Sequence, residues 1–175
     1  MERVIVFIDG SNFYFACKSS HVPAPWDLVK LARDLATDNR RLIRVYYYNA
    51  RSKEDTSSEK AKAEEKFYNF LRNLDYCTVR LGRLEGRGEA VHQKGVDALM
   101  VQDLLTLTFC DAFDCAILIS NDGDFATVIK EIKSRGKQVE VAFLGRPAFH
   151  LRDVCDRYVD LLEKRYKPHF KKTTG

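Results

Sequence analysis

The chain has 175 residues, of which 45% are hydrophobic and 31% are charged, and its formal net charge at pH 7 is +4. This length fits one domain with a buried core, and the composition is that of an ordinary globular protein. No apolar run approaches the roughly 20 residues that a membrane-spanning helix needs, and the first residues lead into a strand rather than a signal peptide. We therefore expect a cytoplasmic protein without membrane segments.

Strands and helices are predicted to alternate along the chain, because apolar runs are followed by segments with helical periodicity. The predicted strands cover residues 4–9, 42–49, 78–84, 116–119 and 138–144. The predicted helices lie within 11–38, over 59–75, after an opening at 94–97, over 124–134 and over 149–164. This alternation indicates a parallel sheet between two helical layers, in one domain over residues 1–163 with a basic tail at 164–175.

The cysteines and histidines show no metal-binding or disulfide pattern. The five cysteines are odd in number, include no Cys-x-x-Cys pair and lie mostly in apolar surroundings. This favours reduced thiols in the core. The four histidines lack the spacing of zinc ligands. The sequence therefore argues against a zinc site and against a disulfide framework.

A polar cluster follows the predicted strand at residues 116–119. Asp122 and Asp124 lie at the carboxyl end of this strand, where open α/β sheets bind ligands. The same residues are also good turn formers, with Gly123 free to take a positive φ and Asp124 able to cap the next helix. Taken alone, the cluster favours a turn over a ligand site.

Two further carboxylates favour the ligand site over the turn. Asp9 ends the first predicted strand, and Asp97 lies in the first turn of a predicted helix, where a helix dipole also favours a negative side chain. If the first and fourth strands are neighbours, Asp9, Asp97, Asp122 and Asp124 converge on one crevice. Four carboxylates together repel one another unless a cation offsets their charge. Mg²⁺ or Mn²⁺ is the expected cation, because both prefer oxygen ligands and accept phosphate oxygens.

Such a site predicts metal-assisted hydrolysis of a phosphodiester, in which no serine, cysteine or histidine nucleophile is required. Clusters of arginine and lysine along the chain supply the positive charge that would hold a nucleic acid backbone. Solvated surface charge is the alternative interpretation of these clusters.

Three motifs together resemble the NYN domain, a relative of the PIN-domain nucleases. They are Phe-Ile-Asp-Gly-Ser-Asn-Phe-Tyr at residues 7–14, Lys-Gly-Val-Asp at 94–97 and Ser-Asn-Asp-Gly-Asp-Phe at 120–125. Residues 136–141 and 151–161 also resemble the closing part of that domain. Each motif alone is weak, but they occur in the family's order and the resemblance covers residues 3 to about 162.

The resemblance implies a PIN-like, Rossmann-like three-layer α/β/α fold with a mainly parallel five-stranded sheet in the order 3-2-1-4-5. It also implies a metal-dependent ribonuclease, expected to be an endoribonuclease, with Asp9, Asp97, Asp122 and Asp124 as the catalytic and metal-binding set. Asn12 and Asn121 would orient ligands or phosphate, and Ser120 would support the loop. We add Lys94 as a candidate phosphate contact, with a solvated loop lysine as the alternative. RNA is the expected partner, and a homodimer is a further expectation because edge strands invite pairing.

The main alternative function is a non-cleaving RNA-binding module that uses the same groove. A phosphohydrolase with Asp9 as nucleophile is disfavoured, because the general acid expected two residues later is Ser11. A dinucleotide-binding fold is disfavoured because no Gly-x-Gly-x-x-Gly follows the first strand.

Overall fold

The computed structural model describes residues 1–22, 26–50, 58–85, 92–163 and Tyr166, apart from the side chains of 83–85 and 92–94. Within these residues, seven strands form one sheet in the order β4-β3-β2-β1-β5-β6-β7. The strands are β1 Arg3–Asp9, β2 Arg41–Ala50, β3 Cys77–Glu85, β4 His92–Lys94, β5 Cys115–Ile119, β6 Gln138–Phe143 and β7 Arg157–Asp160. All pairs are parallel except β3 with β4.

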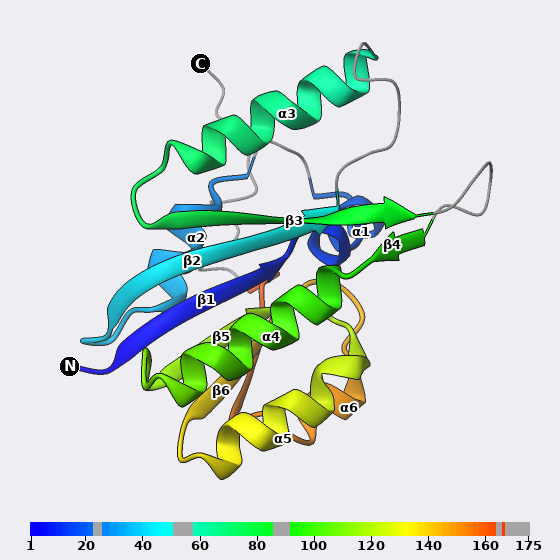
Figure 1. The fold of residues 1–175 in the computed structure, drawn as a ribbon. Helices are drawn as coiled ribbons and strands as arrows, with labels where there is room; N and C mark the ends of the chain where they lie inside the picture. Colours follow the sequence, from blue (N-terminus) through cyan, green and yellow to red (C-terminus); the bar gives the residue numbers. More distant parts are fainter. Residues whose placement is uncertain (23–25, 51–57, 86–91, 164–165, 167–175) are drawn as a thin grey trace.

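Helices cover both faces of the sheet (Figure 1). The helices α1, α2 and α3 pack on one face, and α4, α5 and α6 pack on the other, together with the short 3₁₀ helix η1. Their bounds are α1 Gly10–Ser19, α2 Leu28–Leu35, α3 Glu59–Arg72, α4 Val96–Phe109, η1 Gly123–Phe125, α5 Ala126–Ser134 and α6 Phe149–Arg152. No helix in the described part of the chain combines the length and the apolar character needed to span a bilayer. The predicted three-layer α/β/α fold is confirmed.

The first and fourth predicted strands are continuous apolar runs because they are β1 and β5, the central strands of the sheet. In β1, Val4, Val6 and Ile8 face the core under α1–α3, whereas Ile5 and Phe7 face the core under α4 and α5. All five residues of β5 are buried. A strand covered by helices on both faces needs apolar side chains at every position, so its pattern does not alternate. The predicted order 3-2-1-4-5 is confirmed as β3-β2-β1-β5-β6.

The predicted helix over 149–164 is wrong. The structure has the four-residue helix α6 followed by β7, which pairs with β6 in parallel. The Tyr158 ring stacks on Phe143 with 4.4 Å between ring centroids. Sheet hydrogen bonds and this contact outweigh the helical spacing of the apolar residues. Tyr166, beyond the predicted end of the domain, is buried, and the other residues of the predicted tail lie outside the described residues.

All five cysteines are free thiols, but the prediction that most of them lie in the core holds for only two, since Cys77 and Cys155 are half-buried and Cys110 is exposed. Cys17 and Cys115 are buried, as the apolar surroundings of these residues indicated. Burial raises the pKa of both thiols to about 12, which keeps them protonated at neutral pH.

A buried carboxylate fixes α4 on the sheet. The Asp103 side chain is 10% exposed and accepts a hydrogen bond from the Tyr48 hydroxyl at 2.9 Å. Arg80 donates to both carboxylate oxygens, at 2.9 and 2.7 Å. Tyr48 lies on β2 and Arg80 on β3, so one side chain of α4 joins two strands. This contact holds α4 on the sheet together with the buried side chains of Val96, Met100 and Leu104.

We expect Asp103→Ala to lower the free energy of unfolding by about 2 to 3 kcal/mol, because the buried Tyr48 hydroxyl and the Arg80 guanidinium both lose their acceptor. Tyr48→Phe should cost only about 1 kcal/mol, since Asp103 keeps its two bonds to Arg80. Urea denaturation measures both. The control is Glu131→Ala, which removes an exposed pair with Arg135 and should change stability by less than about 0.5 kcal/mol. Equal losses for Asp103→Ala and Glu131→Ala would contradict this role.

Candidate active site at the carboxyl edge of the sheet

Asp9 is a buried carboxylate at the junction of β1 and α1. Only 5% of the residue is exposed, and it is the N-cap of α1. Its carboxylate accepts hydrogen bonds from the Asn12 amide N–H at 3.0 Å and from the Ser120 hydroxyl at 3.2 Å. These two donors satisfy the carboxylate where water is largely excluded. Asp9 is therefore held by both its own helix and the end of β5.

Gly10 makes the tight exit from β1 possible. A Cβ at this position would lie 2.6 Å from the carbonyl oxygen of Tyr48 and would also clash with the Tyr47 ring. Both neighbours belong to β2, so a larger residue would push α1 away from the sheet. The close approach of α1 to β2 therefore requires glycine directly after Asp9.

Asn12, Ser120 and Asn121 tie the ends of β1 and β5 together. The Asn121 amide N–H donates to the Asn12 side-chain oxygen at 2.9 Å, and the Asp122 amide N–H donates to the Ser120 hydroxyl oxygen at 3.1 Å. The Asn121 side-chain oxygen accepts from the Ala148 N–H and the Tyr158 hydroxyl. Its side-chain nitrogen donates to the Arg146 carbonyl. In the structure, these side chains hold the loops that surround the site.

Asp122 and Asp124 have different surroundings. Asp122 is the N-cap of η1 and accepts a hydrogen bond from the Asp124 N–H at 3.0 Å. The sequence had suggested Asp124 as the cap, so that assignment was wrong by two residues. Asp124 itself is exposed and does not line the pocket described below. The adjacent Phe125 is buried in the core.

Asp97 reaches the site through the turn between β4 and α4. Gly95 has a φ of 85°, in the left-handed region that favours glycine, and the helix begins one residue later. The N-cap makes no side-chain hydrogen bond, and Asp97 lies in the first turn. The interpretation of Asp97 as a helix cap is therefore not supported. For Lys94, which precedes this turn, the structure gives the backbone alone, in β4 opposite Arg83.

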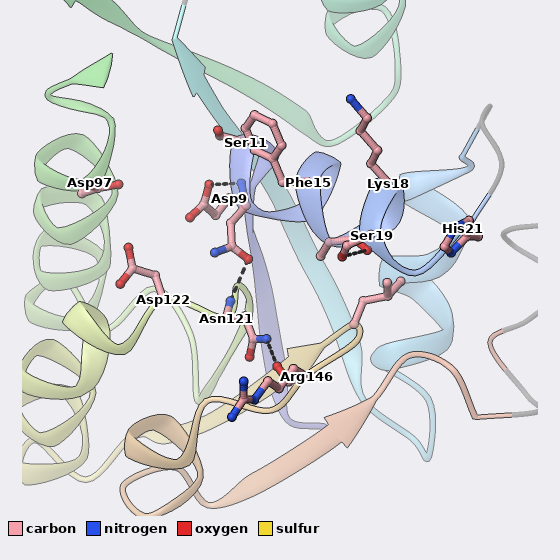
Figure 2. A pocket seen from close by; sticks show the side chains of 13 residues that line it. Asp9, Ser11, Phe15, Lys18, Ser19, His21, Asp97, Asn121, Asp122 and Arg146 are labelled. Atoms are coloured by element: carbon pink, nitrogen blue, oxygen red, sulfur yellow. Dashed lines mark hydrogen bonds between the residues drawn. The ribbon is translucent and has the colours of Figure 1, made fainter. Parts of the chain in front are cut away.

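Three of the four predicted carboxylates line one pocket with a volume of about 900 Å³. Figure 2 shows Asp9, Asp97 and Asp122 on one side of it, with Lys18 and His21 on the other and Phe15 and Arg146 between them. The full lining is Asp9, Ser11, Asn12, Phe15, Ala16, Lys18, Ser19, His21, Asp97, Asn121, Asp122, Leu144 and Arg146. The order of the sheet thus brings together side chains that are more than 110 residues apart.

Of the lining residues from α1 the sequence predicted only Asn12, and it predicted none from the loop after β6. Phe15 and Lys18 follow Ser11 at helical spacing, so one face of α1 lines the pocket. Arg146 lies shortly after β6, at the same carboxyl edge of the sheet as Asp9 and Asp122. The strand-end rule that selected the aspartates could have found Arg146, had it been applied to the fifth predicted strand.

Two carboxylates of the pocket, Asp9 and Asp97, have a raised pKa. For Asp9 the main cause is burial, and the charges of Asp97 and Asp122 add to it. For Asp97 burial again comes first, followed by the charges of Asp122 and Asp124. Among the described residues, Asp9, Asp97 and Asp122 form no ion pair, whereas Asp103, Asp114 and Glu140 each pair with an arginine. The pocket is therefore a place where negative charge is left without a cation.

The donor set fits a hydrated Mg²⁺ or Mn²⁺ ion. Among the described residues, no three His, Cys, Asp or Glu side chains are grouped closely enough to hold one metal ion between them. Mg²⁺ does not require such a cage, because it keeps several waters and binds through one or two carboxylates plus substrate phosphates. Burial and neighbouring negative charge raise the pKa of Asp9 and Asp97, and a divalent cation would offset that charge.

Comparison with known proteins identifies the family. Residues 3–162 match the model of the NYN domain. The chain belongs to the NYN domain family. It is 27% identical to the low amplitude and bright protein LabA of Synechococcus elongatus over 174 residues, covering 94% of this chain and 86% of LabA. Its fold is similar to that of VPA0982, a protein of unknown function from Vibrio parahaemolyticus, with a TM-score of 0.73 and 22% identity over 93% of this chain and 94% of that one.

We expect Asp97→Asn to raise the melting temperature of the metal-free NYN domain at pH 7 to 8. The pKa of Asp97 is raised in the folded protein, so its ionised form destabilises the fold once the pH exceeds that pKa. The advantage of asparagine should shrink as the pH falls below about 4, where the carboxyl is protonated in both the folded and unfolded states. Thermal unfolding in EDTA from pH 4 to pH 8 measures this dependence.

Asp75→Asn is the matched control, because Asp75 is exposed and outside the pocket. It should leave the melting temperature unchanged across the same pH range. A melting temperature for Asp97→Asn below that of the wild type at pH 8 would show that this carboxylate is structural.

Proposed function

We propose that this NYN domain protein is a metal-dependent ribonuclease that hydrolyses RNA phosphodiester bonds with Mg²⁺ or Mn²⁺, cutting internally. The observation that carries this proposal is the pocket in which Asp9, Asp97 and Asp122 lie together without a cationic partner among the described residues. Membership of a family related to the PIN-domain nucleases supports the same reaction class.

The four carboxylates have two roles in this proposal. Asp9, Asp97 and Asp122 together attract the hydrated ion, with one or two of them bound to it directly and the remainder through its waters, and Asp124 adds negative charge from just outside the pocket. When bound, the ion activates water and stabilises negative charge on the phosphate and the leaving oxygen. Asn12 and Ser120 keep the Asp9 carboxylate in place, so we assign them positioning roles. Lys94, which lies two residues before the start of α4, remains our proposed phosphate contact.

A second candidate is a non-cleaving RNA-binding module on the same fold. It is favoured by the absence of a tight three-carboxylate group among the described residues. It is also favoured by the cationic and aromatic side chains on the other side of the pocket, which would bind RNA without chemistry. Tight binding without turnover, in any divalent metal, is what distinguishes this function from a nuclease.

We expect Mg²⁺ or Mn²⁺ to support cleavage of a circular single-stranded RNA, which has no ends and so reports internal cutting alone. EDTA should abolish cleavage. Asp122→Asn and Asp9→Asn should each reduce the rate by at least about 100-fold, because an amide lacks the charge that holds the ion. Both variants should keep a melting temperature equal to or above that of the wild type in EDTA, since asparagine also serves as an N-cap. Gel electrophoresis of labelled RNA follows the reaction.

Two controls separate chemistry from folding. Asp75→Asn should cut at the wild-type rate, and a circular single-stranded DNA of the same sequence reports the preference for RNA.

Mg²⁺ should also raise the melting temperature of the wild type but not of Asp9→Asn, because a ligand stabilises only the state that binds it. Cleavage that persists in EDTA or in Asp122→Asn would overturn the proposal.

A further inference from the structure

One side of the pocket carries an exposed aromatic ring beside the carboxylates. Phe15 is 61% exposed, although it lines a pocket whose other walls are largely polar. Its neighbour Tyr14 packs edge-on against it with 5.5 Å between ring centroids, and Tyr14 also contacts Trp26. Phe15 is therefore an exposed ring that lines the pocket and has an aromatic neighbour.

Positively charged side chains line the same pocket. Lys18 is one turn of α1 beyond Phe15, and Arg146 lies across from it on the loop after β6 (Figure 2). Both side chains are exposed, and neither forms an ion pair within the part of the chain that the structure describes. This contrasts with Arg40 and Arg80, whose guanidinium groups are paired with Glu140 and Asp103. Lys18 and Arg146 thus remain available for an external anion.

An exposed ring and two cations without ion pairs in one pocket match the chemistry of one nucleotide. A base has a π-face that stacks on an aromatic side chain, and its flanking phosphate pairs with lysine and arginine. An acidic peptide would also meet the cations, but it offers no planar ring to Phe15 and would be repelled by Asp9, Asp97 and Asp122. A phosphodiester chain has anionic groups at regular intervals, so it can meet a metal at the carboxylates and the cations on the opposite side.

We propose that Phe15, Lys18 and Arg146 form a nucleotide subsite, in which an unpaired base stacks on Phe15 and the adjacent phosphate contacts Lys18 and Arg146. This inference rests on the proposed function for the position of the scissile phosphate, which would lie at the carboxylates. A base can stack on Phe15 only after it leaves its own helix. The subsite therefore selects single-stranded RNA and disfavours a duplex of the same sequence.

Equilibrium binding of a short fluorescent single-stranded RNA in EDTA tests the stacking, because EDTA prevents metal-dependent cleavage. Phe15→Ala should raise the Kd about 5- to 150-fold, as expected for losing one base stack. Phe15→Trp should bind as tightly as the wild type or more tightly. Phe70→Ala is the matched control, since Phe70 is 56% exposed on α3 and does not line the pocket. It should leave the Kd unchanged.

The salt dependence of the same binding tests the phosphate contact. For single strands, each neutralised phosphate contributes about 0.7 to the slope of log Kd against log salt concentration. Lys18→Gln should lower this slope by about 0.7, and Arg146→Gln should do the same. Lys130→Gln, on an exposed position of α5 outside the pocket, should leave the slope unchanged. The blunt duplex of the same sequence should bind the wild type more weakly than the single strand.

Failure of the subsite and failure of the nuclease give different results. If the wild type cleaves RNA in Mg²⁺ while Phe15→Ala binds and cleaves like the wild type, the subsite is wrong and the nuclease stands. If binding depends on Phe15 but no divalent metal supports cleavage, the subsite stands and the protein is an RNA-binding module. A wild type that binds no single-stranded RNA, or one that prefers the duplex, overturns the subsite.

Discussion

The burial of the Asp9 carboxylate is the constraint on which the rest of the site depends. A carboxylate at 5% exposure is costly unless donors satisfy its oxygens, and the two donors come from different parts of the chain. The Asn12 amide is supplied by the start of α1, and the Ser120 hydroxyl by the residue after β5. The parallel register that pairs Ile8 with Ile119 puts Ser120 at this position. The sheet and the site are therefore specified by the same contact.

Carboxylates at the amino ends of the strands form ion pairs, whereas those in the pocket at the carboxyl ends form none among the described residues. At the amino ends of the strands, Arg3 pairs with Asp114, and Arg40 pairs with the buried Glu140. At the carboxyl ends, the pocket carboxylates have no such partners in the described residues, and burial together with their mutual charge raises the pKa of Asp9 and Asp97. A folded chain that neutralises carboxylates at one edge has the means to do so at the other. This contrast supports the proposal that the unpaired carboxylates of the pocket bind a metal ion.

Much of this fold could be predicted because its signals are local. Five strands appear as apolar runs, and the placement of Asp9 and Asp122 follows from the rule that ligands bind at strand ends. The error over residues 149–164 arose because Leu151, Val154, Tyr158 and Leu162 have helical spacing, and only the edge of β6 decides that this segment pairs as a strand. Tertiary contacts that override a local pattern cannot be seen in that pattern.

Some residues of the site can also be found from the local sequence pattern, whereas others can be found only from the tertiary structure. The aspartates stood out because carboxylates after apolar strands are unusual, whereas Phe15 and Lys18 look like any exposed helix residues until the pocket is known. Some arginines were wrongly expected to bind nucleic acid. Arg40 and Arg80 belong to the arginine and lysine clusters along the chain, but their guanidinium groups form ion pairs with Glu140 and Asp103. Which cations are paired depends on distances across the sheet, and a sequence does not contain them.

The attachment of Asp97 has a consequence for how this domain can change over time. Asp9 and Asp122 are joined through Ser120, so neither can move without disturbing the junction of β1 and β5. Asp97 is carried by α4, which Asp103 joins to β2 and β3. Asp97 is therefore attached to the fold separately from the junction of Asp9, Ser120 and Asp122. Substitutions under α4 can shift Asp97 while that junction persists, so one carboxylate of the proposed metal site can vary independently of the others.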